Sequence, residues 1–199
     1  WFGLNEHDID SDGDMDYFVG NLGANAKFKV DKDHEFHIYG NDFDDNGTYD
    51  IVLSSNYQGN LVPSRGRECS SQQMPFIKEK FKDFTSFASA SLEDIYGEKL
   101  LESLHYQADL LYSVFLKNNG NGDFEIIKLP WQLQVAPVTD FEFVDIDNNN
   151  ETEILAVGNL YNVEVETQRY DAFKGAVFSY TDEGFQVHNP LETGFFTSG

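Results

Sequence analysis

The stretch that decides the fold reads Asp8-Ile9-Asp10-Ser11-Asp12-Gly13-Asp14-Met15-Asp16. Side-chain oxygens stand at positions 1, 3, 5 and 9 of this nine-residue loop, with glycine at position 6. Alternate residues of a tight loop can direct their carboxylates at one centre, so the spacing indicates a site for a hard divalent cation. Gly13 fits because such a turn requires a positive φ at this position. The apolar run 17–19 that follows predicts a β-strand.

The same pattern occurs twice more, which makes it an internal repeat. The second copy reads Asp42-Phe43-Asp44-Asp45-Asn46-Gly47-Thr48-Tyr49-Asp50, and the third reads Asp145-Ile146-Asp147-Asn148-Asn149-Asn150-Glu151-Thr152-Glu153. We call the three copies loop one (8–16), loop two (42–50) and loop three (145–153). Loop three carries Asn150 in place of glycine and Glu153 in place of aspartate, so we expect it to be the weakest site.

The pattern predicts two or three Ca²⁺ sites. Ca²⁺ takes roughly six to eight oxygen ligands at about 2.3–2.6 Å, whereas Mg²⁺ requires octahedral geometry and retains several waters. No Cys/His cluster supports zinc. The predicted side-chain ligands are Asp8, Asp10, Asp12 and Asp16; Asp42, Asp44, Asn46 and Asp50; and Asp145, Asp147, Asn149 and Glu153. Position 7 would add a backbone carbonyl, from Asp14, Thr48 and Glu151 respectively.

An EF-hand begins with the same residues, but it requires a bidentate Glu at position 12 and a helix on each side. Position 12 is Val19, Leu53 and Ala156 in the three copies. Apolar, strand-like runs follow all three loops, at 17–19, 51–53 and 154–157. The pattern therefore favours a loop between two strands.

Short strand-like runs separated by turn residues predict a mainly β chain. They precede loops two and three at 34–39 and 138–144, and they form hairpin patterns at 110–129 and 176–188. Residues 71–110 instead show helical spacing, with Pro75 in a first turn and a capping box at 91–94. We expect this helical insertion to pack against the β framework; docking of a partner is the alternative.

The composition of the chain excludes some classes of binding partner. The 199 residues include 35 acidic and 13 basic ones, for a formal charge of −22, and 13 of the acidic residues lie in the three loops. So negative a chain disfavours nucleic acid and anionic membrane surfaces as partners. No run of 18 apolar residues is present, so we predict no transmembrane segment. The lone Cys69 is expected to be a packed residue.

At the loops, and at the pairs Gly20-Asn21, Ser55-Asn56 and Gly158-Asn159 that end the next strands, the sequence resembles FG-GAP/VCBS repeats. These repeats occur in integrin-α-like propellers and in exported bacterial proteins. The strings 63–75, 118–124, 158–161 and 164–171 look like Bacteroidetes surface proteins with FG-GAP repeats and an ASPIC/UnbV domain. The resemblance implies a calcium-binding β-propeller that is secreted, periplasmic or on the cell surface, and that serves adhesion, glycan or protein binding, or scaffolding.

The resemblance further implies a partial propeller. We assign residues 1–199 to one propeller-type domain, with blades around 1–60, 110–162 and 163–199 and the helical insertion at 71–110. A complete propeller has roughly four to eight blades. The chain begins at Trp1 in mid-pattern, so we interpret it as part of a longer exported protein or of a ring that another chain closes.

We predict no enzymatic activity. The alternative is that the chain is part of a calcium-dependent polysaccharide lyase or glycosidase, because pairs of carboxylates, which such enzymes use, are abundant. The five histidines form no motif with Ser, Cys or Glu partners, and no nucleophile elbow or HExxH sequence occurs. We place His34 and His37 on the surface of a strand.

One polar cluster lies outside the loops and is a second candidate site. Glu164 and Glu166 would share a face of an extended segment, where Arg169 could pair with them. With Asp171 they form either a rim network of salt bridges or a binding site for a sugar or peptide.

Overall fold

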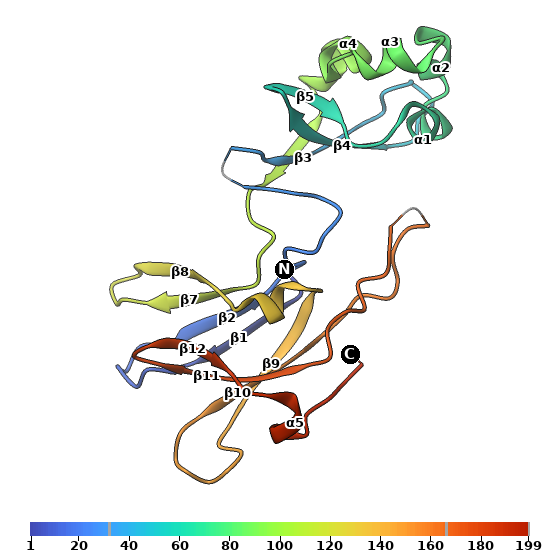
Figure 1. Ribbon diagram of the computed structural model, residues 1–199. Coiled ribbons are helices and arrows are strands. Elements are labelled where there is room, and N and C mark those ends of the chain that lie inside the picture. Colours follow the sequence, from blue (N-terminus) through green and yellow to red (C-terminus); the bar gives the residue numbers. More distant parts are fainter. Residues whose placement is uncertain (32, 166, 199) are drawn as a thin grey trace. The chain divides into compact units, whose positions relative to one another are not determined.

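The computed structural model describes residues 1–31, 33–165 and 167–198. The protein is mainly β, with three antiparallel sheets of four strands each (Figure 1). It divides into two compact units: unit 1 comprises Trp1–Lys27 and Leu111–Gly199, and unit 2 comprises Phe28–Leu110. Unit 2 is therefore inserted in sequence between the two segments of unit 1.

Unit 1 contains two sheets, with strand orders β1-β2-β7-β8 and β12-β11-β10-β9. Their strands are β1 (Gly3–His7), β2 (Asp16–Gly20), β7 (Val114–Asn118), β8 (Phe124–Lys128), β9 (Val138–Val144), β10 (Glu153–Gly158), β11 (Ala176–Thr181) and β12 (Gly184–Val187). A 3-10 turn η2 (Trp131–Gln134) and a short helix α5 (Pro190–Thr193) complete the unit.

The core of unit 1 is aromatic and draws on both sheets. Phe18 on β2, Phe115 on β7 and Phe178 on β11 are fully buried in one cluster, and the Phe18 and Phe115 rings stack at 4.7 Å. Gly20 explains how closely the two sheets approach, because a Cβ there would overlap the carbonyl oxygen of Val138. The first sheet therefore packs directly on the start of β9.

Unit 2 contains the third sheet, in the order β5-β4-β3-β6. Its strands are β3 (Phe36–Asn41), β4 (Asp50–Tyr57), β5 (Asn60–Pro63) and β6 (Leu104–Ala108). Its helices are α1 (Arg67–Gln73), α2 (Phe76–Lys80), α3 (Phe84–Ala88) and α4 (Leu92–Tyr96), followed by the 3-10 turn η1 (Gly97–Leu100). Helix and sheet residues share one core, in which Val52, Ile77 and Ile95 are buried. The insertion therefore packs on the β framework, as expected.

The helical prediction was partly correct. The capping box is present, since the Asp94 N–H donates to Ser91 Oγ (3.1 Å) and the Ser91 N–H donates to Asp94 Oδ2 (2.9 Å). Helical structure extends from Arg67 to Leu100 in short pieces, and the helical assignment to Leu104–Ala108 was wrong. These residues form β6, because they pair with β3, a partner more than 60 residues away.

The predicted blade boundaries also differ from the sheets. Residues 1–60 contribute strands to two different sheets, because β2 pairs with β7 across the whole of unit 2, with Phe18 opposite Phe115. Residues 138–187 form one complete four-stranded sheet rather than parts of two blades. Within the described part of the chain the three sheets form no closed barrel or propeller. No described helix combines the length and the apolar character needed to cross a membrane.

Candidate metal centres

Each of the three loops joins two neighbouring antiparallel strands. Loop one connects β1 to β2, loop two connects β3 to β4, and loop three connects β9 to β10. No helix flanks any of them. The prediction of a loop between strands, and not an EF-hand, is confirmed.

The position-1 carboxylate organises each turn through backbone donors. In loop one Asp8 accepts from the N–H groups of positions 5 and 6 at 3.1 Å each. Asp42 accepts from the equivalent groups at 3.0 and 2.8 Å, and Asp145 at 3.1 and 2.9 Å. The position-5 side chain then accepts from the N–H of position 7, at 2.9, 2.7 and 2.6 Å in loops one to three. One hydrogen-bond pattern thus fixes all three turns.

The position-9 carboxylate lies at the mouth of the following strand and is buried. Asp16, Asp50 and Glu153 are 1%, 2% and 8% exposed. Each accepts from the N–H of position 2, at 3.3, 3.0 and 2.9 Å respectively. Glu153 makes the same bond despite its additional methylene, so glutamate replaces aspartate in loop three without loss of this contact.

Two residues of each loop have a positive φ. Position 6 has φ of 97°, 83° and 69° at Gly13, Gly47 and Asn150, as the sequence predicted. Position 4 has φ of 59°, 60° and 60°, a feature that the sequence analysis missed. The available signal was the residue type, because Ser11, Asp45 and Asn148 are small polar residues, and Asp and Asn are enriched in this conformation.

The side chains at positions 1, 3 and 9 converge. In each loop one carboxylate oxygen from each of the three lies within 4.8 Å of the others. Two ligands on opposite sides of a Ca²⁺ ion are separated by roughly 5 Å, so this spacing fits such an ion. The sets are Asp8, Asp10 and Asp16; Asp42, Asp44 and Asp50; and Asp145, Asp147 and Glu153.

Position 3 supplies an independent indication of a ligand. Asp10 Oδ1 and Asp44 Oδ1 are buried and have no hydrogen-bond partner among the described residues. A buried carboxylate oxygen without a partner is costly, and native structures rarely leave one unsatisfied. A cation held among positions 1, 3 and 9 would satisfy both oxygens. The donor sets therefore fit a bound divalent cation.

The remaining predicted ligands are not part of these groups. Asp12 Oδ1 accepts from the Asp14 N–H, and Asp12 contributes no atom to the convergent set of loop one. Asn46 and Asn149 make the equivalent contacts with position 7. Coordination by position 5, and by the position-7 carbonyls of Asp14, Thr48 and Glu151, stays a prediction.

The charge balance of the loops is uneven. Burial raises the pKa of Asp16 and of Asp50, and the neighbouring carboxylates of each loop add to the effect. The Gly47 N–H bond lowers the pKa of Asp42. Lys117 Nζ lies 2.7 Å from Asp10 Oδ2, so this lysine leaves the unpartnered Oδ1 of the same carboxylate available.

The second candidate cluster forms two separate ion pairs. Lys27 Nζ lies 3.8 Å from Glu164 Oε1, and an Arg169 guanidinium nitrogen lies 3.6 Å from Asp171 Oδ2. Among the described residues Arg169 thus pairs with Asp171 and not with Glu164, and its predicted pairing with Glu166 stays a prediction. Glu166 lies outside the described residues.

Two histidine contacts were not evident from the sequence. His37 is only 7% exposed, so its predicted surface position was wrong: β6 brings His105 Nε2 to 2.9 Å from His37 Nδ1. Burial, and secondarily His105, lowers the pKa of His37. In unit 1, His188 Nε2 lies 2.8 Å from Ser179 Oγ.

The chain matches no family model, and no curated protein or solved structure is similar to it.

Proposed function

We propose that this chain is a calcium-binding, non-catalytic module of an extracytoplasmic protein, built from blades of the FG-GAP type. The observation that carries the proposal is the threefold recurrence of one loop geometry, with convergent carboxylates from positions 1, 3 and 9. An acidic surface turn would need no such convergence, and it would not bury the position-9 carboxylate at the start of a strand.

Positions 1, 3 and 9 of each loop contribute to ion binding in different ways. The position-1 carboxylate is oriented by two backbone N–H groups, and the position-9 carboxylate is oriented by the N–H of position 2. In loops one and two, position 3 brings a buried oxygen that lacks another partner among the described residues. Bound Ca²⁺ would supply positive charge at the junction of two strands. Because clustered carboxylates repel each other without it, ion binding would stabilise each hairpin.

The propeller assignment rests on the sheets. Propeller blades are four-stranded antiparallel sheets, and the described residues form three of these. Further sheets of the same protein, or a second chain, would close the ring. In this role the module would present its loops and rims to a glycan or protein partner, as an adhesion, ligand-binding or scaffolding element.

A calcium-dependent polysaccharide-active enzyme is the second candidate, and one observation favours it. A groove of about 730 Å³ runs beside loops one and three and is lined by Asp10, Glu151, Ser179 and Asp182 among others. Ser179 contacts His188, yet no described carboxylate hydrogen-bonds the other nitrogen of that ring, so the orienting member of a catalytic triad is absent from the described residues. Release of unsaturated or reducing sugar from pectic polymers would favour the enzyme.

Titration with Ca²⁺ and with luminescent Tb³⁺ tests the proposal directly. We expect two or three sites in the wild type, and loss of one site each in Asp10→Asn, Asp44→Asn and Asp147→Asn. Asp123→Asn and Asp109→Asn are matched controls, because both aspartates are exposed and lie outside the loops. A wild type that binds neither ion, or control variants that lose as much binding as the loop variants, would contradict the proposal.

A further inference from the structure

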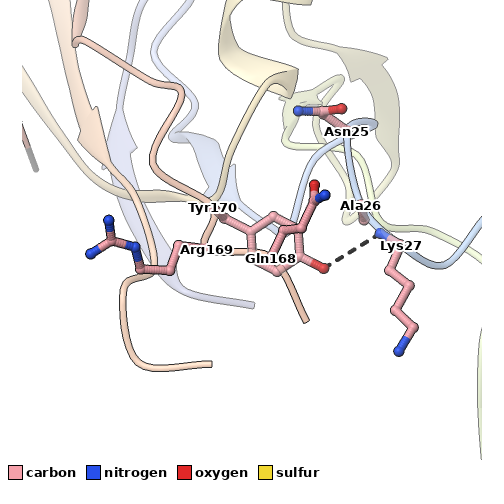
Figure 2. A pocket seen from close by; sticks show the side chains of 6 residues that line it. All are labelled: Asn25, Ala26, Lys27, Gln168, Arg169 and Tyr170. Atoms are coloured by element: carbon pink, nitrogen blue, oxygen red, sulfur yellow. Dashed lines mark hydrogen bonds between the residues drawn. The ribbon is translucent and has the colours of Figure 1, made fainter. Parts of the chain in front are cut away.

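A pocket of about 380 Å³ lies on unit 1, and no residue of loops one and three lines it (Figure 2). It is lined by Asn25, Ala26, Lys27, Gln168, Arg169 and Tyr170. None of the described lining residues is acidic, although acidic residues outnumber basic ones by 35 to 13 in the chain. Two of the 13 basic side chains, Lys27 and Arg169, thus line the same concave surface.

Both walls of the pocket are fixed by hydrogen bonds. The backbone groups of Tyr170 and Leu160 bond each other in both directions, at 2.8 and 3.0 Å. The Tyr170 side chain is 8% exposed, and its hydroxyl accepts from the Lys27 N–H at 3.4 Å, the dashed line of Figure 2. On the other wall Asn25 donates from its backbone to Gln134 O and from Nδ2 to Val135 O, both at 3.1 Å. The pocket is therefore preformed.

Each of the two basic side chains lies within 4.0 Å of an exposed carboxylate. The Lys27–Glu164 pair spans 3.8 Å and the Arg169–Asp171 pair spans 3.6 Å, and all four side chains are substantially exposed. Exposed ion pairs of this kind contribute little, about 0–1 kcal/mol. Figure 2 shows the two side chains extending on either side of the Tyr170 ring. A ligand carboxylate can therefore take the place of Asp171 beside Arg169 at small cost.

The neutral lining residues suit hydroxyl groups. The Asn25 amide oxygen accepts, and the Gln168 amide can both donate and accept. The Tyr170 hydroxyl accepts from Lys27 but donates to no described residue, so its own hydrogen is available to a ligand. Guanidinium groups bind carboxylates in a bidentate manner. Because the chain as a whole is strongly negative, a ligand with a single carboxylate is repelled less than a polyphosphate.

We propose that this pocket binds a saccharide that carries a carboxylate, of the uronic acid class. Arg169 contacts the carboxylate, and Lys27, Asn25, Gln168 and the Tyr170 hydroxyl contact the sugar hydroxyls. The volume lies near the lower end of small-ligand pockets and suits one or two sugar units. The inference deepens the proposed binding role, on which it rests, by giving the chemical class of the ligand and its site.

Heteronuclear NMR titration of the calcium-loaded chain tests the pocket, with galacturonate as the probe and galactose and acetate as matched controls. Galacturonate is expected to shift the amide signals of 25–27 and 168–171. Galactose lacks the carboxylate and acetate lacks the hydroxyls, so each should bind at least about tenfold more weakly than galacturonate. Equal responses to acetate and galacturonate would overturn the proposal, because they indicate a site for any small anion.

Variants assign the contacts. Arg169→Gln and Lys27→Gln should each weaken galacturonate binding about tenfold or more, whereas Lys174→Gln, at an exposed lysine outside the pocket, should leave it unchanged. Gln168→Ala should weaken galacturonate and galactose alike but not acetate. Unchanged galacturonate binding in Arg169→Gln would refute the assignment.

Tb³⁺ luminescence on the same samples separates this inference from the proposed calcium sites. Ion binding without any galacturonate-induced shift would contradict the proposed sugar pocket and leave the proposed calcium sites intact. Galacturonate binding without ion binding would retain the pocket and remove the calcium module. Because uronates also bind Ca²⁺, shifts confined to loops one and three would place the sugar at bound ions and contradict the proposed pocket.

Discussion

Unit 1 and unit 2 bury their sheets in different ways, yet they contain the same loop. In unit 1 two sheets share an aromatic core around Phe18, whereas in unit 2 four short helices cover one sheet. Loop two in unit 2 nevertheless repeats the hydrogen bonds of loops one and three in unit 1. The geometry of the loop is therefore independent of what packs against the strands it joins.

The reason lies in the range of the contacts. Every shared hydrogen bond joins residues no more than seven positions apart, so the nine-residue segment organises itself once the two strands pair. The cation would then act on each unit through its own loops.

Removal of the metal should have the largest effect, and the effect should differ between the units. At an ion concentration of about 100 times Kd, each occupied site adds about 2.7 kcal/mol to the free energy of unfolding. Unit 1 holds two loops and unit 2 holds one, so chelation should destabilise unit 1 more. Hydrogen exchange of peptides from each unit, with and without EDTA, measures this. Identical exchange and an unchanged melt in excess chelator would contradict structural calcium.

Loss of a position-9 carboxylate should have the second largest effect on the free energy of unfolding. Asp16→Ala removes a buried acceptor of two backbone N–H groups, those of Ile9 and Asn118, and should cost about 2–3 kcal/mol even without metal. Asp50→Ala should have a similar effect on unit 2. Asp14→Ala is the matched control: it keeps the position-7 carbonyl and changes an exposed side chain, so it should cost less than about 0.5 kcal/mol. Urea unfolding in EDTA compares them, and equal losses would rule out the burial argument.

Acidification should distinguish the units. Burial and His105 lower the folded-state pKa of His37, and Glu35 opposes them. The unfolded chain therefore binds this proton more readily, so the associated stability of unit 2 is present above about pH 6.5 and declines as the pH falls below that value. The slope for one site cannot exceed about 1.4 kcal/mol per pH unit.

Hydrogen exchange of β3 and β6 between pH 7.5 and 5.5, corrected for intrinsic rates, measures this decline. His37→Gln should flatten it, whereas His34→Gln, at the exposed histidine of the same unit, should not. A slope that persists in His37→Gln would show that another group titrates.

Substitution of the position-6 residue should have the smallest effect on stability. Asn150 adopts φ of 69° and Gly47 adopts 83°, so Asn150→Gly and Gly47→Asn should each change stability by less than about 1 kcal/mol. Gly47→Val should cost more, because β-branched residues are strained at positive φ. Chemical denaturation compares the three. A large loss in Gly47→Asn would show that the loops tolerate asparagine unequally.

The local features were predictable from sequence, and the long-range ones were not. The convergence of the carboxylates at positions 1, 3 and 9, the turn residue at position 6 and the capping box of Ser91 each depend on a few consecutive residues, and these were predicted correctly. Coordination by positions 5 and 7 stays a prediction. The pairing of β2 with β7 and the pairing of β6 with β3 both depend on partners more than 60 residues away in the sequence. Leu104 looked helical because its spacing from Leu100 and Leu101 fits a helix, and strand pairing overrode that preference.

The candidate sites divide in the same way. By itself the sequence determined which residues gather at each loop, because a tight turn between strands brings positions 1, 3 and 9 together whatever surrounds it. Only the tertiary structure decided that Lys27 and Arg169 share a pocket and that His37 is buried against His105. Those contacts join segments 68 to about 140 residues apart, and their proximity follows from the packing of whole sheets and not from any local preference of the chain.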